Sequence, residues 1–125
     1  MISVKDALRI HAIIIEKIGG TNGLRDEGAL ISALARPFAT FDSVELYPSP
    51  IRKAAALAES IIVNHPFVDG NKRMGYVLMR LLLMKYGYDI AASENQKYDF
   101  IIGIANGQLK TEQIYNWLEQ HVTKK

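Results

Sequence analysis

The sequence predicts an all-α fold. Apolar residues recur at helical spacing along most of the chain, and the resulting segments are bounded by glycines, prolines or capping residues. Only one short stretch looks extended. A chain of 125 residues has the length of one domain and can bury about two-thirds of its unfolded surface. We therefore expect a single helical domain over residues 1–125.

The N-terminal part of the chain predicts two helices. Ser3 and Asp6 resemble a helix start, and apolar side chains then follow at helical spacing until Gly19-Gly20 ends the pattern. A second, shorter helix is expected to begin near Asp26. It should end before Pro37, because the residue before a proline disfavours helical backbone.

Residues 36–50 are expected to form a loop or flap, which can include a short hairpin. The segment carries three prolines and lacks strong periodicity, and loops of this length are more often functional than idle. One interpretation of its aromatic residues is a small satellite core of Phe38, Phe41 and Tyr47.

Two helices in the middle of the chain are expected to pack against each other. Residues Ile51 to Asn64 are rich in alanine and apolar on nearly every side, which is typical of a buried helix. Residues Asn71 to Tyr86 predict the second helix, ended by Gly87 in the pattern of a C-terminal glycine cap. Residues 65–70, which join the two, are therefore a loop between central helices.

The C-terminal part predicts two further helices after a brief extended piece at Tyr88-Asp89-Ile90. Ser93 and Gln96 have the spacing of a capping box and open a helix that reaches about Ala105. Thr111 is expected to cap the last helix. The apolar positions of that helix are Ile114, Trp117, Leu118 and Val122.

Composition excludes several classes of function. The chain has no cysteine, which excludes disulfides, thiolate metal sites and a cysteine nucleophile. Its formal net charge of +2 is too small for a broad nucleic-acid interface. No secretory pattern follows Met1, and the most apolar window, Tyr76 to Met84, is well short of the roughly 18 residues of a membrane span. We expect a cytoplasmic protein that binds no membrane and no nucleic acid directly.

The loop between the central helices carries residues typical of phosphate chemistry. Pro66 disfavours helical backbone at His65 and leaves the imidazole at the mouth of the loop, where a neutral histidine can act as a general base. Asp69 can hold a Mg²⁺ ion that bridges phosphate oxygens. Gly70 lets the backbone approach a phosphate, and the N–H groups from Asn71 onward form an anion-binding helix N-terminus.

Lys72 and Arg73 strengthen this interpretation. Taken singly, each feature has a plain alternative: a loop histidine without function, an ordinary turn at Asp69-Gly70, or a solvated helix start. Two cations at a helix N-terminus are unfavourable, however, because they oppose the helix dipole. An anion bound between them removes this conflict, and the cations can neutralise charge that develops on a transferred phosphoryl group.

The string from His65 to Arg73, HPFVDGNKR, resembles the signature of the Fic/Doc (Fido) family, His-x-Phe-x-Asp/Glu-Gly/Ala-Asn-Gly/Lys-Arg. The chain length, the flap before the motif and the flanking helices also resemble the short death-on-curing (Doc) toxins of that family. The resemblance implies a Fic/Doc-type helical domain in which the motif loop joins two central helices.

The resemblance also implies a role for each matched residue. His65 would take the proton of a target hydroxyl, and Asp69 would hold Mg²⁺. Gly70, Asn71 and the adjoining N–H groups would cradle the nucleotide phosphates, and Arg73 would clamp them.

Two further positions are informative by the same resemblance. Phe67 would pack inward and fix the loop. Lys72 stands where the nucleotidyl-transferring Fic enzymes usually have glycine, and its side chain would fill part of the anion hole. This resembles the Doc arrangement, in which the terminal phosphate is transferred. The second arginine found three residues after the first in many Fic enzymes is Tyr76 here.

By this resemblance we expect the toxin of a toxin–antitoxin pair, a kinase-like enzyme with ATP and Mg²⁺ that phosphorylates a hydroxyl of a cytosolic protein. The implied target is elongation factor Tu, so that translation is blocked. In this family the flap receives the target segment, which is the second interpretation of its aromatic residues. Two alternatives stay open: AMP transfer of the Fic type, and a catalytically silent protein-binding module.

The intact His65, Asp69 and Asn71 argue against the silent module, because a pure binder needs no base opposite an anion cradle. The family's inhibitory motif, Ser or Thr four residues before a Glu that Gly or Asn follows, is absent: Gly23 precedes Glu27-Gly28 at that spacing, and Ile90 precedes Glu94-Asn95. A separate antitoxin is therefore expected to restrain the enzyme.

Overall fold

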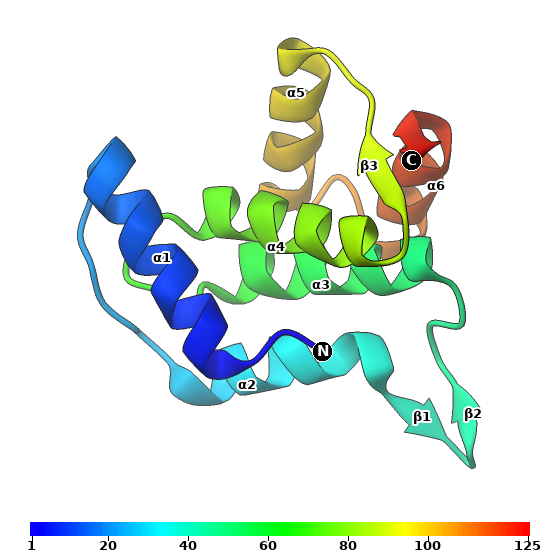
Figure 1. Cartoon of the computed structure of the whole chain (residues 1–125), viewed down its shortest axis with the longest axis horizontal. Helices are drawn as coiled ribbons and strands as arrows, with labels where there is room; N and C mark the ends of the chain where they lie inside the picture. Colours follow the sequence, from blue (N-terminus) through cyan, green and yellow to red (C-terminus); the bar gives the residue numbers. More distant parts are fainter.

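The computed structural model describes residues 1–125 and confirms the all-α prediction. Two central helices lie side by side, with two helices near the N-terminus on one side of them and two helices from the C-terminal part on the other (Figure 1). In chain order the helices are α1 (Val4–Ile18), α2 (Glu27–Ala35), a short 3₁₀ helix η1 (Arg36–Phe38), α3 (Pro50–Asn64), α4 (Asn71–Lys85), α5 (Glu94–Ala105) and α6 (Thr111–His121).

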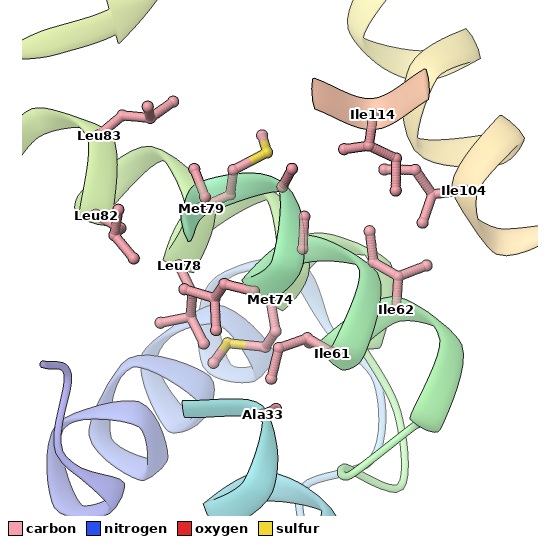
Figure 2. Close-up of a cluster of buried hydrophobic side chains, with 14 of the residues drawn as sticks. Ala33, Ile61, Ile62, Met74, Leu78, Met79, Leu82, Leu83, Ile104 and Ile114 are labelled. Carbon is pink, nitrogen blue, oxygen red and sulfur yellow. The ribbon is translucent and has the colours of Figure 1, made fainter. Parts of the chain in front are cut away.

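Helix α3 lies at the centre because its surface is apolar almost all round. Ten of the 15 residues of α3 are buried, and most of these are alanine, leucine or isoleucine. Gly75 of α4 lies against Ile62 of α3 so closely that an added Cβ would clash with the isoleucine side chain, which explains the glycine at this position. Figure 2 shows side chains of α3 and α4 meeting in the core, joined by Ile104 of α5 and Ile114 of α6.

The flap contains the expected hairpin. Strands β1 (Thr40–Phe41) and β2 (Val44–Glu45) pair antiparallel, and both residues of the turn between them have positive φ, as this type of tight hairpin requires. The hairpin projects away from the helices (Figure 1). Phe41 at its tip is 76% exposed, so the three aromatic residues of the flap do not form a satellite core together.

A buried lysine of α3 holds the base of the flap. Nζ of Lys53 lies 2.7 Å from a carboxylate oxygen of Glu45 and 2.6 Å from the carbonyl oxygen of Tyr47. Lys53 is 5% exposed, and a buried cation of this kind needs such partners. The flap is therefore fixed at its base and open at its tip.

The C-terminal part differs from the sequence-based expectation in two places. Thr111 does not cap α6: the N-cap residue is Lys110, and the Thr111 hydroxyl donates to Glu59 of α3 at 2.7 Å. Val122 is not helical either. It begins strand β4 (Val122–Lys124), which pairs antiparallel with β3 (Tyr88–Ile90), and Ile90 is its direct partner. None of the helices has the length and apolar content that crossing a membrane would require.

Candidate functional site

The motif loop, residues 65–70, is held by backbone hydrogen bonds to the segment that joins α1 and α2. We call that segment, residues 19–26, the bracing loop. The carbonyl oxygen of Pro66 accepts from the N–H groups of Arg25 at 2.8 Å and Asp26 at 3.0 Å, and the N–H of Val68 donates to Gly23 at 3.0 Å. An isolated β-bridge joins Leu24 to Phe67. The two loops therefore behave as one small strand pair, and the motif loop does not depend on its own turn chemistry alone.

His65 ends α3 in the left-handed conformation, with φ 50° and ψ 60°. For a residue other than glycine such a backbone costs about 1–3 kcal/mol and persists only where neighbours hold it. The side chain is exposed. His65 is thus outside α3, as the following proline predicted, and it is open to solvent.

Phe67 and Asn71 point inward and tie the loop to the start of α4. The Asn71 side-chain oxygen accepts from the N–H of Phe67 at 3.0 Å, and its side-chain nitrogen donates to the carbonyl oxygen of Phe67 at 2.9 Å. Phe67 is 1% exposed and Asn71 is 8% exposed. The Asn71 amide is thus occupied within the loop and ties it to the first residue of α4.

His11 of α1 packs against the inner face of the same loop. Its ring stacks on Phe67 with a centroid distance of 4.0 Å, and its Nε2 lies 2.8 Å from the carbonyl oxygen of Asp69. A carbonyl oxygen only accepts, so Nε2 carries the hydrogen in this contact. His11 is buried, and it acts as a support for the loop.

The Asp69 carboxylate is exposed and is oriented by backbone donors. It accepts from the N–H of Thr21 in the bracing loop at 3.1 Å and from the N–H of Gly70 at 2.8 Å. These two hydrogen bonds, led by that from Thr21, lower the pKa of Asp69 below its usual value, so the group is anionic at neutral pH. A Cβ on Gly20 would come within 2.7 Å of one carboxylate oxygen, and the backbone φ there is +113°. Glycine at position 20 is therefore needed for the carboxylate to sit in this place.

The N-terminus of α4 directly follows the motif loop. Gly70 is its N-cap residue, with φ 78°, and no side chain caps the helix. The first N–H groups of a helix lack intrahelical acceptors, so they stay available to an anion. The side chains of Lys72 and Arg73 are exposed beside them. Of the predicted residues, His65, Asp69, Lys72 and Arg73 are exposed, whereas Phe67 and Asn71 are buried.

A pocket of about 290 Å³ lies between the start of α4 and α5. The α4 side contributes both cations of the motif, and the α5 side contributes charged, aromatic and aliphatic side chains. Lys97 of α5 pairs with Glu94 at 3.4 Å and lies 5.8 Å from the ring centroid of Tyr76. The lining residues are Lys72, Arg73, Tyr76, Glu94, Lys97, Tyr98, Ile101 and Ile102.

Sequence reasoning missed the residues that support the motif from a distance. No pattern in the sequence pointed to a contact between His11 and the motif loop, and Gly19-Gly20 was interpreted only as the end of the first helix. The glycines at positions 19, 20 and 23 were the available signal, since all three have positive φ.

Comparisons with known proteins identify the family of this chain. A family model described as the Fic/DOC family matches residues 1–83. The protein named Toxin Doc from Mycolicibacterium smegmatis is 45% identical over 74 residues, which cover 59% of this chain and 57% of that protein. A Fido domain-containing protein from Dictyostelium discoideum is 40% identical over 53 residues, 40% of this chain and 37% of that protein.

The Protein adenylyltransferase Fic of Drosophila willistoni is 28% identical over 123 residues, which cover 84% of this chain and 25% of the larger protein. The chain thus spans 57% or less of the length of these relatives. The region matched by the family model includes the bracing loop, the motif loop, all of α3 and α4 up to Leu83. On the family match and the intact motif, the chain belongs to the Fic/DOC family.

Proposed function

We propose that this chain transfers the terminal phosphate of ATP to a hydroxyl group of a protein. The observation that supports the proposal most is an exposed histidine, His65, in the short loop that leads into an uncapped helix N-terminus with Lys72 and Arg73. This arrangement supplies a base for the hydroxyl and a positive surface for the phosphates within one short segment.

In the proposed reaction, His65 accepts the proton of the attacking hydroxyl. The hydroxyl oxygen forms a bond to the terminal phosphorus as the bond to the leaving oxygen of ADP breaks. The N–H groups at the start of α4, with Arg73 and Lys72, stabilise the negative charge on the transferred group and on the leaving phosphate. The motif loop itself is held in shape by Asn71, Phe67 and His11.

The site fits a Mg²⁺ ion that binds together with the nucleotide phosphates. No group of three or more histidine, aspartate or glutamate side chains is arranged to hold a metal by itself. The exposed Asp69 carboxylate accepts one N–H on each oxygen and keeps further lone pairs. Mg²⁺ is usually bound by one or two carboxylates together with substrate phosphates. When bound, the ion would neutralise phosphate charge, and Asp69 would be its protein ligand.

The pocket between α4 and α5 is the proposed seat for the remainder of ATP. Its volume of about 290 Å³ is near the lower end for small-molecule sites. It opens beside Lys72 and Arg73, so a nucleotide with one phosphate at the helix N-terminus can extend into it. Tyr98, which is 67% exposed, offers a ring to the base.

AMP transfer is the second candidate. It is favoured by the similarity to the adenylyltransferase Fic of Drosophila willistoni. Lys72 favours phosphate transfer instead, because by the family resemblance its side chain would fill part of the anion hole that seats further phosphates in AMP-transferring enzymes. Both reactions use the same base and the same cradle, and they differ in which phosphorus atom lies beside His65.

The proposed biological role is that of a toxin whose target is a cytosolic protein, elongation factor Tu, and whose activity is restrained by a separate antitoxin. Similarity to Toxin Doc supports the toxin role. The exposed Phe41, Val44 and Leu46 of the flap offer apolar contacts for a target segment.

The test is incubation of the purified chain with cell lysate and ATP labelled on either the terminal or the innermost phosphate. Label on a protein from the terminal phosphate alone supports phosphate transfer. Label from the innermost phosphate supports AMP transfer. A chain that labels nothing but still binds a protein in the lysate would be a silent binding module.

His65→Ala is the variant that assigns the label to this site. Removal of a general base costs about 10²- to 10⁴-fold in rate, so labelling and growth arrest should both be lost while the fold is kept. Arg9→Ala, on the exposed side of α1, is the matched control. A His65→Ala variant as active as the wild type would overturn the assignment of the base.

A further inference from the structure

The imidazole of His65 has no hydrogen-bond partner among the side-chain contacts of the chain, and the residue is exposed. Histidine bases are commonly oriented by a third group that binds the second ring nitrogen. Here no such group is present. The backbone conformation of residue 65 fixes the direction of its Cα–Cβ bond and so limits the positions that the ring can reach.

One side chain of the bracing loop holds that conformation. Arg25 Nε donates to the carbonyl oxygen of His65 at 2.5 Å, and its Nη2 donates to the carbonyl oxygen of Asn64 at 2.6 Å. The guanidinium is a rigid planar fork. The two carbonyl groups flank the backbone torsions of residue 65, so bonding both to one rigid group limits rotation between them.

The backbone of Arg25 adds a third point of attachment. Its N–H donates to the carbonyl oxygen of Pro66 at 2.8 Å. Arg25 therefore contacts three successive carbonyl groups, at positions 64, 65 and 66. Without the fork, residue 65 would be held only through its neighbours, by the end of α3 on one side and by the bonded Pro66 carbonyl on the other.

We infer that Arg25 is a positioning residue for His65, which keeps the left-handed backbone of the base and thereby aims its imidazole at the anion cradle. This inference rests on the proposed function, in which His65 is the base. Arg25 is exposed, and the motif loop keeps its other backbone bonds to the bracing loop without it. Loss of the side chain should thus alter the aim of His65 more than the folding of the domain.

The first measurement follows residue 65 directly and needs no enzyme activity. The chain has three histidines, so selective labelling with ¹³C- and ¹⁵N-histidine gives a simple NMR spectrum. In Arg25→Ala the Cα shift and the N–H to Hα coupling of His65 should move away from left-handed values, while His121 stays unchanged. Arg25→Lys replaces the fork by a single ammonium group, so it should change the His65 shift and coupling less than Arg25→Ala does. Arg9→Ala should leave all three histidines as in the wild type.

The second measurement is the rate of label transfer from ATP. Arg25→Ala should lower kcat by about 10- to 100-fold, since misplacement of a catalytic group by about 1 Å costs about 100-fold. The KM for ATP should change by less than about twofold, because Arg25 does not line the nucleotide pocket. Arg25→Lys should lie between Arg25→Ala and the wild type.

Unchanged His65 signals in Arg25→Ala would overturn the inference whatever the activity. Altered signals with an unchanged kcat would overturn it as well. A wild-type chain that transfers no label would refute the proposed function instead. The NMR comparison would still decide whether Arg25 sets the conformation of His65.

Discussion

His11 and Asp69 lie 58 positions apart in the sequence, yet Nε2 of His11 is 2.8 Å from the backbone carbonyl oxygen of Asp69. The same ring stacks on Phe67. One buried side chain of α1 thus contacts the motif loop at its packing residue and at its carboxylate residue. The carbonyl bond also leaves the Asp69 carboxylate free to face solvent, where the bracing loop orients it.

His11→Ala should destabilise the protein by about 2–4 kcal/mol. The change removes a buried ring from the core and leaves the carbonyl group of Asp69 without a donor. The free energy of unfolding in urea measures the effect. Arg9→Ala on the exposed side of the same helix is the control and should change it by less than about 0.5 kcal/mol. Equal stability of the two variants would show that His11 is not a support of the loop.

Asn71→Asp should also destabilise the fold, although it places a negative charge at a helix N-terminus. The helix dipole would stabilise that charge by about 0.3–1 kcal/mol. The loss is larger, because the carboxylate cannot donate to the Phe67 carbonyl oxygen now 2.9 Å from Asn71 Nδ2, and an unsatisfied buried group costs about 1–3 kcal/mol. A lowered melting temperature is the expected readout. A raised one would show that the dipole outweighs the hydrogen bond.

The helices and the motif were predictable because their signals are local. Ser3, Asp26 and Ser93 each accept a backbone N–H at a helix start, as their positions suggested. The contacts of His11 and Arg25 with the motif loop span 58 and 40 positions, respectively, and no periodicity within one helix contains that information.

The errors at the C-terminus have the same origin. Thr111 has the residue type of an N-cap, but its hydroxyl is drawn to Glu59 of α3, and the capping-box contact is made by Gln113 to the backbone of Lys110 instead. Val122 continues the apolar spacing of α6, yet pairing with Ile90 makes it a strand residue. Tertiary partners overrode local preference in both cases.

The ion pair between Asp89 and Arg80 predicts a pH dependence of stability. Two hydrogen bonds from the Arg80 side chain, with one from the N–H of Ile90, hold the pKa of Asp89 well below its usual range. The unfolded carboxyl has a pKa of about 3.9. The contribution is therefore fully present above about pH 4 and is lost as the pH falls through the folded pKa.

Asp89→Asn is the variant that tests this. Arg80 is half-exposed, so solvent screening limits the expected loss at neutral pH to about 1–2 kcal/mol. The difference in unfolding free energy between wild type and variant should shrink as the pH falls below about 4. A difference that stays constant down to about pH 2 would contradict the assignment of the pH dependence to this pair.

Tyr98→Ala should weaken ATP binding by about 5- to 150-fold. Stacking of a base on an aromatic ring contributes about 1–3 kcal/mol, and Tyr98 lines the pocket between α4 and α5. Isothermal titration with a non-hydrolysable ATP analogue measures the affinity. Tyr86→Ala is the control, because Tyr86 is exposed at the far end of α4. Equal affinity of the two variants would place the nucleoside elsewhere.

Lys72→Gly should lose phosphate transfer. The lysine contributes a full charge beside the uncapped start of α4, and glycine there also weakens the first turn of the helix by about 1 kcal/mol. The same change leaves more bare N–H groups at the helix N-terminus, which is the cradle that AMP transfer needs for the outer phosphates. The loss of phosphate transfer is expected to be complete within detection. The gain of AMP transfer is expected to be small, because Tyr76 supplies no second cation to those phosphates.

Labelling with the two forms of labelled ATP measures both the loss and the gain. Wild-type labelling from the innermost phosphate, with no change in Lys72→Gly, would show that Lys72 does not select the phosphate and would favour AMP transfer as the activity of this site.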